Sequence, residues 1–206
     1  MAERARPKLA IFVKAPVMGR AKTRLAQGLG AVHAMRIYRA LIAQTMRRLA
    51  RDARWDTVLA VTPDRFARQG AFHNLMPDGA SRIPQAPGDL GRRMARIFAA
   101  LAPGPAVIVG CDIPDLRAND IAQAFRALCR ADAVLGPARD GGYWLIGFAR
   151  TRNARALEKP IRWSSAHALA DTKAALGTLC AELLRTQSDI DTLEDYESWR
   201  RGRNES

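Results

Sequence analysis

Several aspartates follow short apolar runs that could form β-strands, and their carboxylates could bind a divalent cation. Asp112 comes directly after the apolar run 107–111, and Pro114 then prevents the run from continuing as a central strand. Open α/β sheets bind their ligands at the carboxyl ends of the strands, so a carboxylate there could hold a metal ion on a nucleotide. An ordinary turn or helix cap at Asp112 is the alternative.

Three further aspartates show the same placement. Asp140 opens the turn sequence Asp140-Gly141-Gly142, and Asp189 and Asp191 lie two residues apart. Alternate residues of an extended chain share a face, so Asp189 and Asp191 could both bind metal, or one could cap the next helix. Asp140 could orient or deprotonate an acceptor hydroxyl, or only form a hairpin turn. We therefore predict Mg²⁺ or Mn²⁺ on Asp112, Asp189 and Asp191, with Asp112 and Asp140 as the catalytic candidates.

A loop rich in cations follows the first apolar run and could bind phosphate. It contains Lys14, Gly19, Lys22 and Arg24. The glycine permits close backbone approach, the lysines supply compact charges, and arginine can bind phosphate through two parallel hydrogen bonds. The spacing is not that of a Walker A loop, because the first glycine of that motif is absent. A solvated basic loop is the alternative to a phosphate site.

A second glycine-rich segment, 88–94, precedes a predicted helix. It places two glycines next to Asp89 and Arg93. A helix N-terminus of this kind is suited to contact ribose, base or phosphate, so we include Asp89 and Arg93 among the nucleotide-binding candidates. An ordinary capped helix is an equally good interpretation.

The elements that would position these residues alternate between strand and helix. Strands are predicted at 8–13, 57–62, 106–109, 133–136 and 143–148, with short ones within 75–87 and at 179–184. Helices are predicted at 31–53, 64–70, 90–101, 119–130, 165–176 and 192–201, the last capped by Thr192 and Asp195, and a loop is predicted from 14 to 29. This alternation predicts a single-domain, three-layer α/β/α sandwich around a mostly parallel sheet.

The composition fits one globular domain. The chain has 206 residues, of which 48% are hydrophobic, and it contains no apolar stretch near the roughly 20 residues of a membrane span. No signal peptide is apparent at the N-terminus, so we predict a cytoplasmic protein with flexible ends at 1–7 and 202–206. The three cysteines, Cys111, Cys129 and Cys180, have no metal or disulfide spacing and are predicted to be free and mostly buried.

The net charge of +13 raises nucleic acid as a partner. However, the arginines are spread through most predicted helices, and only 6% of residues are aromatic, which leaves few side chains for base stacking. A non-catalytic nucleic-acid binding module is therefore the less favoured hypothesis. Attraction of small anionic substrates, or merely a solvated basic surface, accounts for the charge equally well.

Six motifs in one order resemble the radical-SAM/selenodomain-associated transferase family, over about residues 8 to 198. They lie at 14–25, 88–94, 110–116, 136–143, 161–164 and 189–192. The resemblance implies the nucleotide-diphospho-sugar transferase fold, which is the A-type, Rossmann-like fold of glycosyltransferases. Segment 111–114 is also similar to molybdenum-cofactor guanylyltransferases, and segments 22–25 and 189–192 to phospholactate guanylyltransferases. These similarities imply metal on Asp112 and nucleotide phosphates on Lys14, Lys22 and Arg24.

The leading hypothesis is a metal-dependent glycosyltransferase that takes a nucleotide-sugar donor and a small acceptor. The alternative is a nucleotidyltransferase that takes a nucleoside triphosphate and releases pyrophosphate. The fourth strand is not followed by the Asp-x-Asp triplet of many A-type glycosyltransferases, because Asp112 is followed by Asp115 instead.

Overall fold

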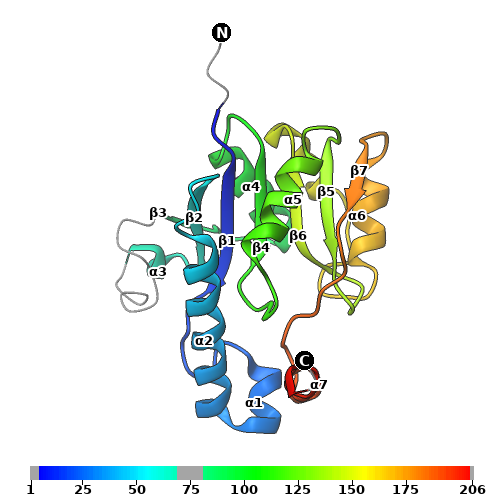
Figure 1. Ribbon diagram of the computed structural model, residues 1–206. Coiled ribbons are helices and arrows are strands. Elements are labelled where there is room, and N and C mark those ends of the chain that lie inside the picture. The colour runs from blue at the N-terminus through cyan, green and yellow to red at the C-terminus, as the bar shows by residue number, and fades with distance from the viewer. Residues whose placement is uncertain (1–4, 69–80, 205–206) are drawn as a thin grey trace.

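A seven-stranded sheet organises the protein, with helices on both faces (Figure 1). The computed structural model describes residues 5–68 and 81–204. The strands are β1 (Lys8–Lys14), β2 (Asp56–Thr62), β3 (Ser81–Pro84), β4 (Ala106–Gly110), β5 (Ala133–Pro137), β6 (Tyr143–Phe148) and β7 (Ala181–Leu183). Their order across the sheet is β3-β2-β1-β4-β6-β5-β7. The predicted strands are all present among the described residues. The inner strands are short apolar runs that the sheet buries, whereas the edge strands β3 and β7 contain no buried residue.

Most neighbouring strands are parallel, as the sequence predicts. Strand β1 is parallel to β2 and β4, and β5 is parallel to β7. The exception is β6, which lies between β4 and β5 and is antiparallel to both. The ends of β4 and β5 therefore point to the same edge of the sheet with one strand between them. This places Asp112 and Asp140 on that edge.

The helices form the outer two layers of the predicted sandwich. They are α1 (Thr23–Leu29), α2 (Ala31–Leu49), α3 (Arg65–Arg68), α4 (Leu90–Ala100), α5 (Ala118–Ala127), α6 (Ala168–Leu176) and α7 (Leu193–Asn204), with a 3₁₀ helix at Thr151–Glu158. One cluster of buried side chains joins α2 and α5 to one face of the sheet, and another joins α4, α6 and the 3₁₀ helix to the opposite face. The predicted three-layer architecture is confirmed.

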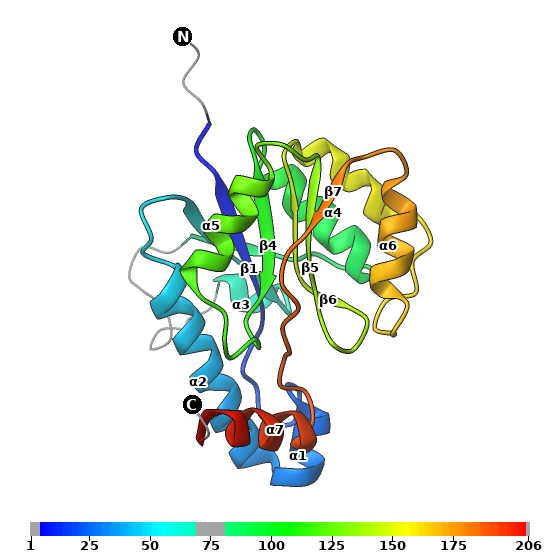
Figure 2. The ribbon, with the colours of Figure 1, turned by 45° about the vertical axis from the view of Figure 1, so that its right-hand side comes forward.

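Helices α1 and α7 lie side by side beyond the carboxyl ends of the strands (Figure 2). The sequence predicts a loop over 14–29, and this is wrong for 23–29, which form α1. Leu25 is fully buried there beside Ile190, and Gly28 fits closely because a Cβ on it would lie 2.8 Å from Cβ of Leu193. A short helix of this kind is stabilised by tertiary packing rather than by its own propensity.

Other differences concern helix ends and surface groups. Helix α2 ends at Leu49 and α5 at Ala127, both earlier than predicted, and the 3₁₀ helix was not predicted.

The three cysteines are free, but only Cys111 is buried, so the expected burial of Cys129 and Cys180 is wrong. Parts of the predicted helix 64–70 and segment 75–87, and of the ends predicted to be flexible, fall outside the described residues. Within the described ranges, no helix is both long and apolar enough to cross a bilayer.

Candidate active site

Asp112 lies just past the end of β4 and forms an ion pair with Lys22. Its Oδ2 accepts a hydrogen bond from Lys22 Nζ at 2.9 Å, and the Lys22 side chain is only 7% exposed. The backbone at Gly110 leaves room for the carboxylate, because a Cβ there would lie 2.8 Å from Asp112 Oδ1. The predicted position of Asp112 at a strand end is therefore confirmed, while its role as a metal ligand stays a prediction.

Lys22 also contacts the second predicted metal ligand. Its Nζ lies 3.4 Å from Asp191 Oδ1, and Arg24 Nη1 lies 3.2 Å from Asp191 Oδ2. Burial tends to lower the pKa of Lys22, but the charges of Asp112 and Asp191 outweigh burial, and the pKa is raised above its ordinary value. Lys22 therefore stays protonated among the carboxylates. Its own backbone has the left-handed conformation (φ 50°).

Asp189 completes the group of carboxylates. The segment that carries it is tied to the end of β4, because the amide of Ile190 donates to the carbonyl oxygen of Asp112 at 3.1 Å. Burial raises the pKa of Asp189 to about 6, and the charge of Asp112 adds to this effect. The charge of Lys22 lowers the pKa of Asp189, but it does not outweigh burial and the charge of Asp112.

The donor chemistry of this group fits a hard divalent cation, since carboxylate oxygens are the ligands that Mg²⁺ and Mn²⁺ prefer. The geometry is not that of a preformed metal centre: within residues 5–68 and 81–204, no three Asp, Glu, His or Cys side chains are arranged to hold a metal ion. Lys22 lies between two of the predicted ligands instead. Binding of a cation to Asp112 and Asp191 would therefore require the Lys22 ammonium group to move away.

Asp140 forms the turn between β5 and β6. Its Oδ1 accepts a hydrogen bond from the amide of Gly142 at 2.9 Å, and Gly141 has a φ of +83° with the carbonyl of Ala166 packed against it. The hairpin-turn alternative is thus correct for the backbone. Asp140 nonetheless lines the same two pockets as Asp189, which are described below. The turn fixes the carboxylate at the edge of the site, so the two interpretations are compatible.

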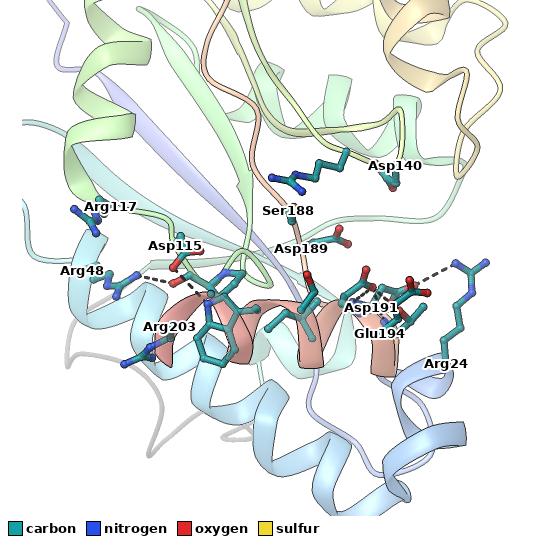
Figure 3. Close-up of a pocket in the computed structure, with 18 residues that line it drawn as sticks. Arg24, Arg48, Asp115, Arg117, Asp140, Ser188, Asp189, Asp191, Glu194 and Arg203 are labelled. Carbon is teal, nitrogen blue, oxygen red and sulfur yellow. Dashed lines mark hydrogen bonds and ion pairs between the residues drawn. The ribbon is translucent and has the colours of Figure 1, made fainter. Parts of the chain in front are cut away.

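Three adjoining pockets meet at these carboxylates. The inner pocket, of about 560 Å³, lies beside β1 and α4 and includes Lys14, Arg93 and Asp112. The middle pocket, of about 230 Å³, shares Asp112 with the inner pocket and shares Asp140 and Asp189 with the third. That third, outer pocket, of about 910 Å³, lies between the sheet edge and α7 (Figure 3). A ligand in the inner pocket and another in the outer pocket could approach each other through the middle pocket, which Asp112, Asp140 and Asp189 line.

The predicted nucleotide-binding residues are divided among these regions. Lys14 and Arg93 line the inner pocket, and burial lowers the pKa of Arg93. Arg24 lines the outer pocket. Asp89 caps α4 by accepting from the amide of Arg92 at 2.8 Å, which is the ordinary-cap alternative. Gly19 is an exposed loop residue with a φ of +72°. Neither Asp89 nor Gly19 is among the residues lining the three pockets.

Sequence reasoning missed several polar side chains of the pockets. Gln85 is 1% exposed in the inner pocket, where its Nε2 donates to the carbonyl oxygen of Ala60 at 2.7 Å and its Oε1 has no partner among the described residues. In the outer pocket, Arg48, Arg117 and Arg203 come from three different helical regions. No local signal distinguishes these arginines from the many others in the sequence.

Comparison with known proteins relates this architecture to one family. Residues 45–165, more than half of the chain, match the family described as "Uncharacterized protein conserved in bacteria (DUF2064)". The chain belongs to the DUF2064 family. None of the curated proteins matches this DUF2064 chain. Its predicted association with radical-SAM proteins stays a prediction.

Solved structures share the fold of this DUF2064 protein. A candidate nucleotide-diphospho-sugar transferase from Desulfovibrio desulfuricans G20 is 30% identical with a TM-score of 0.87, over 97% of this chain and 88% of that one. CMP:2-keto-3-deoxy-manno-octonic acid synthetase, solved with CTP, is 11% identical with a TM-score of 0.62, over 98% and 99%. Rv0371C from Mycobacterium tuberculosis H37Rv, solved with manganese, is 16% identical with a TM-score of 0.56, over 94% and 97%. The predicted nucleotide-diphospho-sugar transferase fold is therefore confirmed.

Proposed function

We propose that this DUF2064 protein is a metal-dependent transferase that acts on a nucleotide-activated substrate. The observation that carries the proposal is that the middle pocket connects the inner and outer pockets, since it shares Asp112 with the inner one and Asp140 and Asp189 with the outer one. Two substrates can occupy such an arrangement with their reacting groups together at the carboxyl edge of the sheet, which is where open α/β folds bind their ligands. The transferase fold of the related structures supports the same conclusion.

In this proposal the inner pocket binds the nucleotide. Lys14 and Arg93 supply positive charge there, and Asp112 lies at its edge. Asp112, Asp189 and Asp191 would hold Mg²⁺ or Mn²⁺, and the bound cation would act as a Lewis acid on the departing phosphate group. Two proteins of this fold were solved with manganese and with CTP, which supports a divalent cation and a nucleotide as the ligands of this proposal. Lys22, once released from Asp112 and Asp191, would provide a compact positive charge for the same group.

The reaction that we favour is glycosyl transfer. The acceptor hydroxyl oxygen forms a bond to the anomeric carbon of the sugar, while the bond from that carbon to the nucleotide diphosphate breaks. Asp140, whose carboxylate is oriented by the Gly142 amide, takes the hydroxyl proton. The similarity to the D. desulfuricans protein, a candidate nucleotide-diphospho-sugar transferase, supports this choice.

Nucleotidyl transfer is the second candidate, and the position of Asp115 favours it. Asp115 Oδ1 accepts a hydrogen bond from Trp199 Nε1 at 3.4 Å, and Asp115 lines the outer pocket. Of the two aspartates that follow β4, only Asp112 forms an ion pair with Lys22. The end of β4 therefore contributes one carboxylate there, and not the two of the Asp-x-Asp triplet found in many A-type glycosyltransferases. In this reaction an acceptor oxygen attacks the α-phosphorus of a nucleoside triphosphate and pyrophosphate leaves. The released product separates the candidates, because glycosyl transfer releases a nucleoside diphosphate, whereas nucleotidyl transfer releases pyrophosphate.

A thermal-shift panel of nucleoside triphosphates and nucleotide-sugars, with and without Mn²⁺, tests the proposal. We expect at least one nucleotide to raise the melting temperature more with Mn²⁺ than without it. Asp112→Asn should abolish this cation-dependent part while the protein stays folded. Asp56→Asn, at the opposite edge of the sheet, is the matched control and should behave as the wild type. Cation-independent binding of DNA or RNA that weakens steeply with salt would instead support the nucleic-acid hypothesis.

A further inference from the structure

The outer pocket is mainly acidic at one end, where Arg24 pairs with Asp191, and mainly basic at the other (Figure 3). Asp140, Asp189 and Asp191 lie at the end that adjoins the middle pocket, and Arg48, Arg117 and Arg203 lie toward the other. The arginines come from the end of α2, the start of α5 and the end of α7, and only the tertiary structure brings them together. The volume of about 910 Å³ is ample for a small molecule that reaches from one end to the other.

Arg48 is held in place at the arginine end. Its Nη1 donates to the carbonyl oxygens of Pro114 and Leu116, each at 2.8 Å. These bonds fix one edge of the guanidinium group against the loop after β4. A planar guanidinium group fixed in this way loses little conformational entropy when it binds an oxyanion.

Arg117 and Arg203 form no ion pair with any described residue. Arg203 lies over the ring of Trp199, 5.2 Å from its centroid. One carboxylate, Asp115, belongs to this end of the pocket, and it accepts a hydrogen bond from the Trp199 indole. Three cations thus face one carboxylate. Burial lowers the pKa of Arg48, the charge of Arg117 lowers it further, and the charge of Asp115 raises it.

We infer that the arginine end of the outer pocket binds an oxyanion of the acceptor, either a phosphate or a carboxylate group. Arginine is suited to both, because its parallel N–H groups match two oxygens of either anion. The acceptor's reacting group would then lie at the opposite end, beside Asp140 and Asp189. This last step rests on the proposed function, whereas the oxyanion site itself does not.

The indole N–H signal of Trp199 gives a local readout by NMR, because this side chain lines the arginine end. It is assigned with Trp199→Phe. The probes are glycerol 3-phosphate, glycerate and uncharged glycerol, each titrated at constant ionic strength. We expect glycerol 3-phosphate, glycerate or both to shift the Trp199 signal, and glycerol to have no effect. The stronger of the two anions identifies the preferred oxyanion.

Paired variants separate a defined site from general positive charge. Arg117→Gln combined with Arg203→Gln should weaken anion binding by about tenfold or more, because each removes a charged hydrogen bond. Arg126→Gln combined with Arg201→Gln removes the same charge from the same two helices, outside the pocket, and should leave the affinity unchanged. Equal weakening in both pairs, or an unshifted Trp199 signal with both anions, would overturn the inference.

The same variants distinguish a failure of this inference from a failure of the proposed function. Nucleotide stabilisation with Mn²⁺ should be unchanged in the Arg117→Gln, Arg203→Gln variant, because the nucleotide is assigned to the inner pocket. Anion binding at Trp199 in a protein that binds no nucleotide would contradict only the proposed function. Nucleotide binding without any anion effect at Trp199 would contradict only the oxyanion site.

Discussion

Lys22 Nζ lies 2.9 Å from Asp112 Oδ2, although 90 residues separate them in the sequence. The same ammonium group contacts Asp191, so its positive charge partly neutralises both carboxylates. The Lys22 ammonium group thus occupies the position in which the sequence predicts a divalent cation. An ammonium ion and a metal ion would compete for the same carboxylates, and this competition leads to the first prediction.

Lys22→Met should lower the stability of the protein by about 1–3 kcal/mol, because it leaves Asp112 and Asp191 without their shared cation. Partial exposure of both carboxylates favours the lower part of that range. Mn²⁺ should raise the melting temperature more in the variant than in the wild type. Lys159→Met, which removes a lysine bonded to the carbonyl of Ala175, is the control. An equal effect of Mn²⁺ on wild type and Lys22→Met would show that the cation does not use these carboxylates.

Arg24→Ala should reduce affinity for nucleotides more than it reduces stability. Its pair with Asp191 is a surface ion pair, with the Arg24 side chain 71% exposed, and such pairs contribute at most about 1 kcal/mol. If the diphosphate extends from the inner pocket to the acidic end of the outer pocket, where Arg24 pairs with Asp191, removal of Arg24 should cost about 1.5–3 kcal/mol of binding free energy. Isothermal titration with a nucleotide and its nucleoside measures this, with Arg20→Ala as a control from the same loop. Equal losses for nucleotide and nucleoside would show that Arg24 does not contact phosphate.

Asp140→Asn should separate catalysis from binding. Asparagine keeps an oxygen that can accept from the Gly142 amide, so the turn should survive, but it cannot accept the proton of the acceptor. Turnover should fall by about 10²- to 10⁴-fold, while nucleotide affinity stays within about threefold. Asp140→Ala should lose turnover equally and some stability as well. A variant that keeps full turnover would limit Asp140 to its role in the turn.

The raised pKa of Asp189 should make the free energy of unfolding depend on pH. Its pKa is about 6 in the folded protein, against about 3.9 in an unfolded chain. The folded state therefore keeps this proton to higher pH, and the contribution of Asp189 to stability decreases as the pH rises from about 4 to about 6. Asp189→Asn should gain stability relative to the wild type across this window, measured by urea unfolding with a chelator present. Parallel curves for the two proteins would rule out the shift.

The positions of Asp112 and Asp140 followed from local sequence. A short run of β-branched residues forms a buried strand almost wherever it lies, and Gly and Pro mark its end. The Thr192 and Asp195 cap of α7 was predicted for the same reason, and Asp195 Oδ2 accepts from the amide of Thr192 at 2.7 Å. These features depend on residues within a few positions of each other, so the amino-acid sequence is sufficient to find them.

The relationships across the site depended on the tertiary structure. The sequence predicted β5 and β6 as a hairpin, but it could not show that β6 lies between β4 and β5. The role of Lys22 in phosphate binding stays a prediction, and the local sequence did not show that its ammonium group is paired with two aspartates 90 and 169 residues away. The arginine end of the outer pocket likewise combines three helices. Such contacts depend on how the whole sheet and its helices pack, so they cannot be predicted from the local sequence pattern.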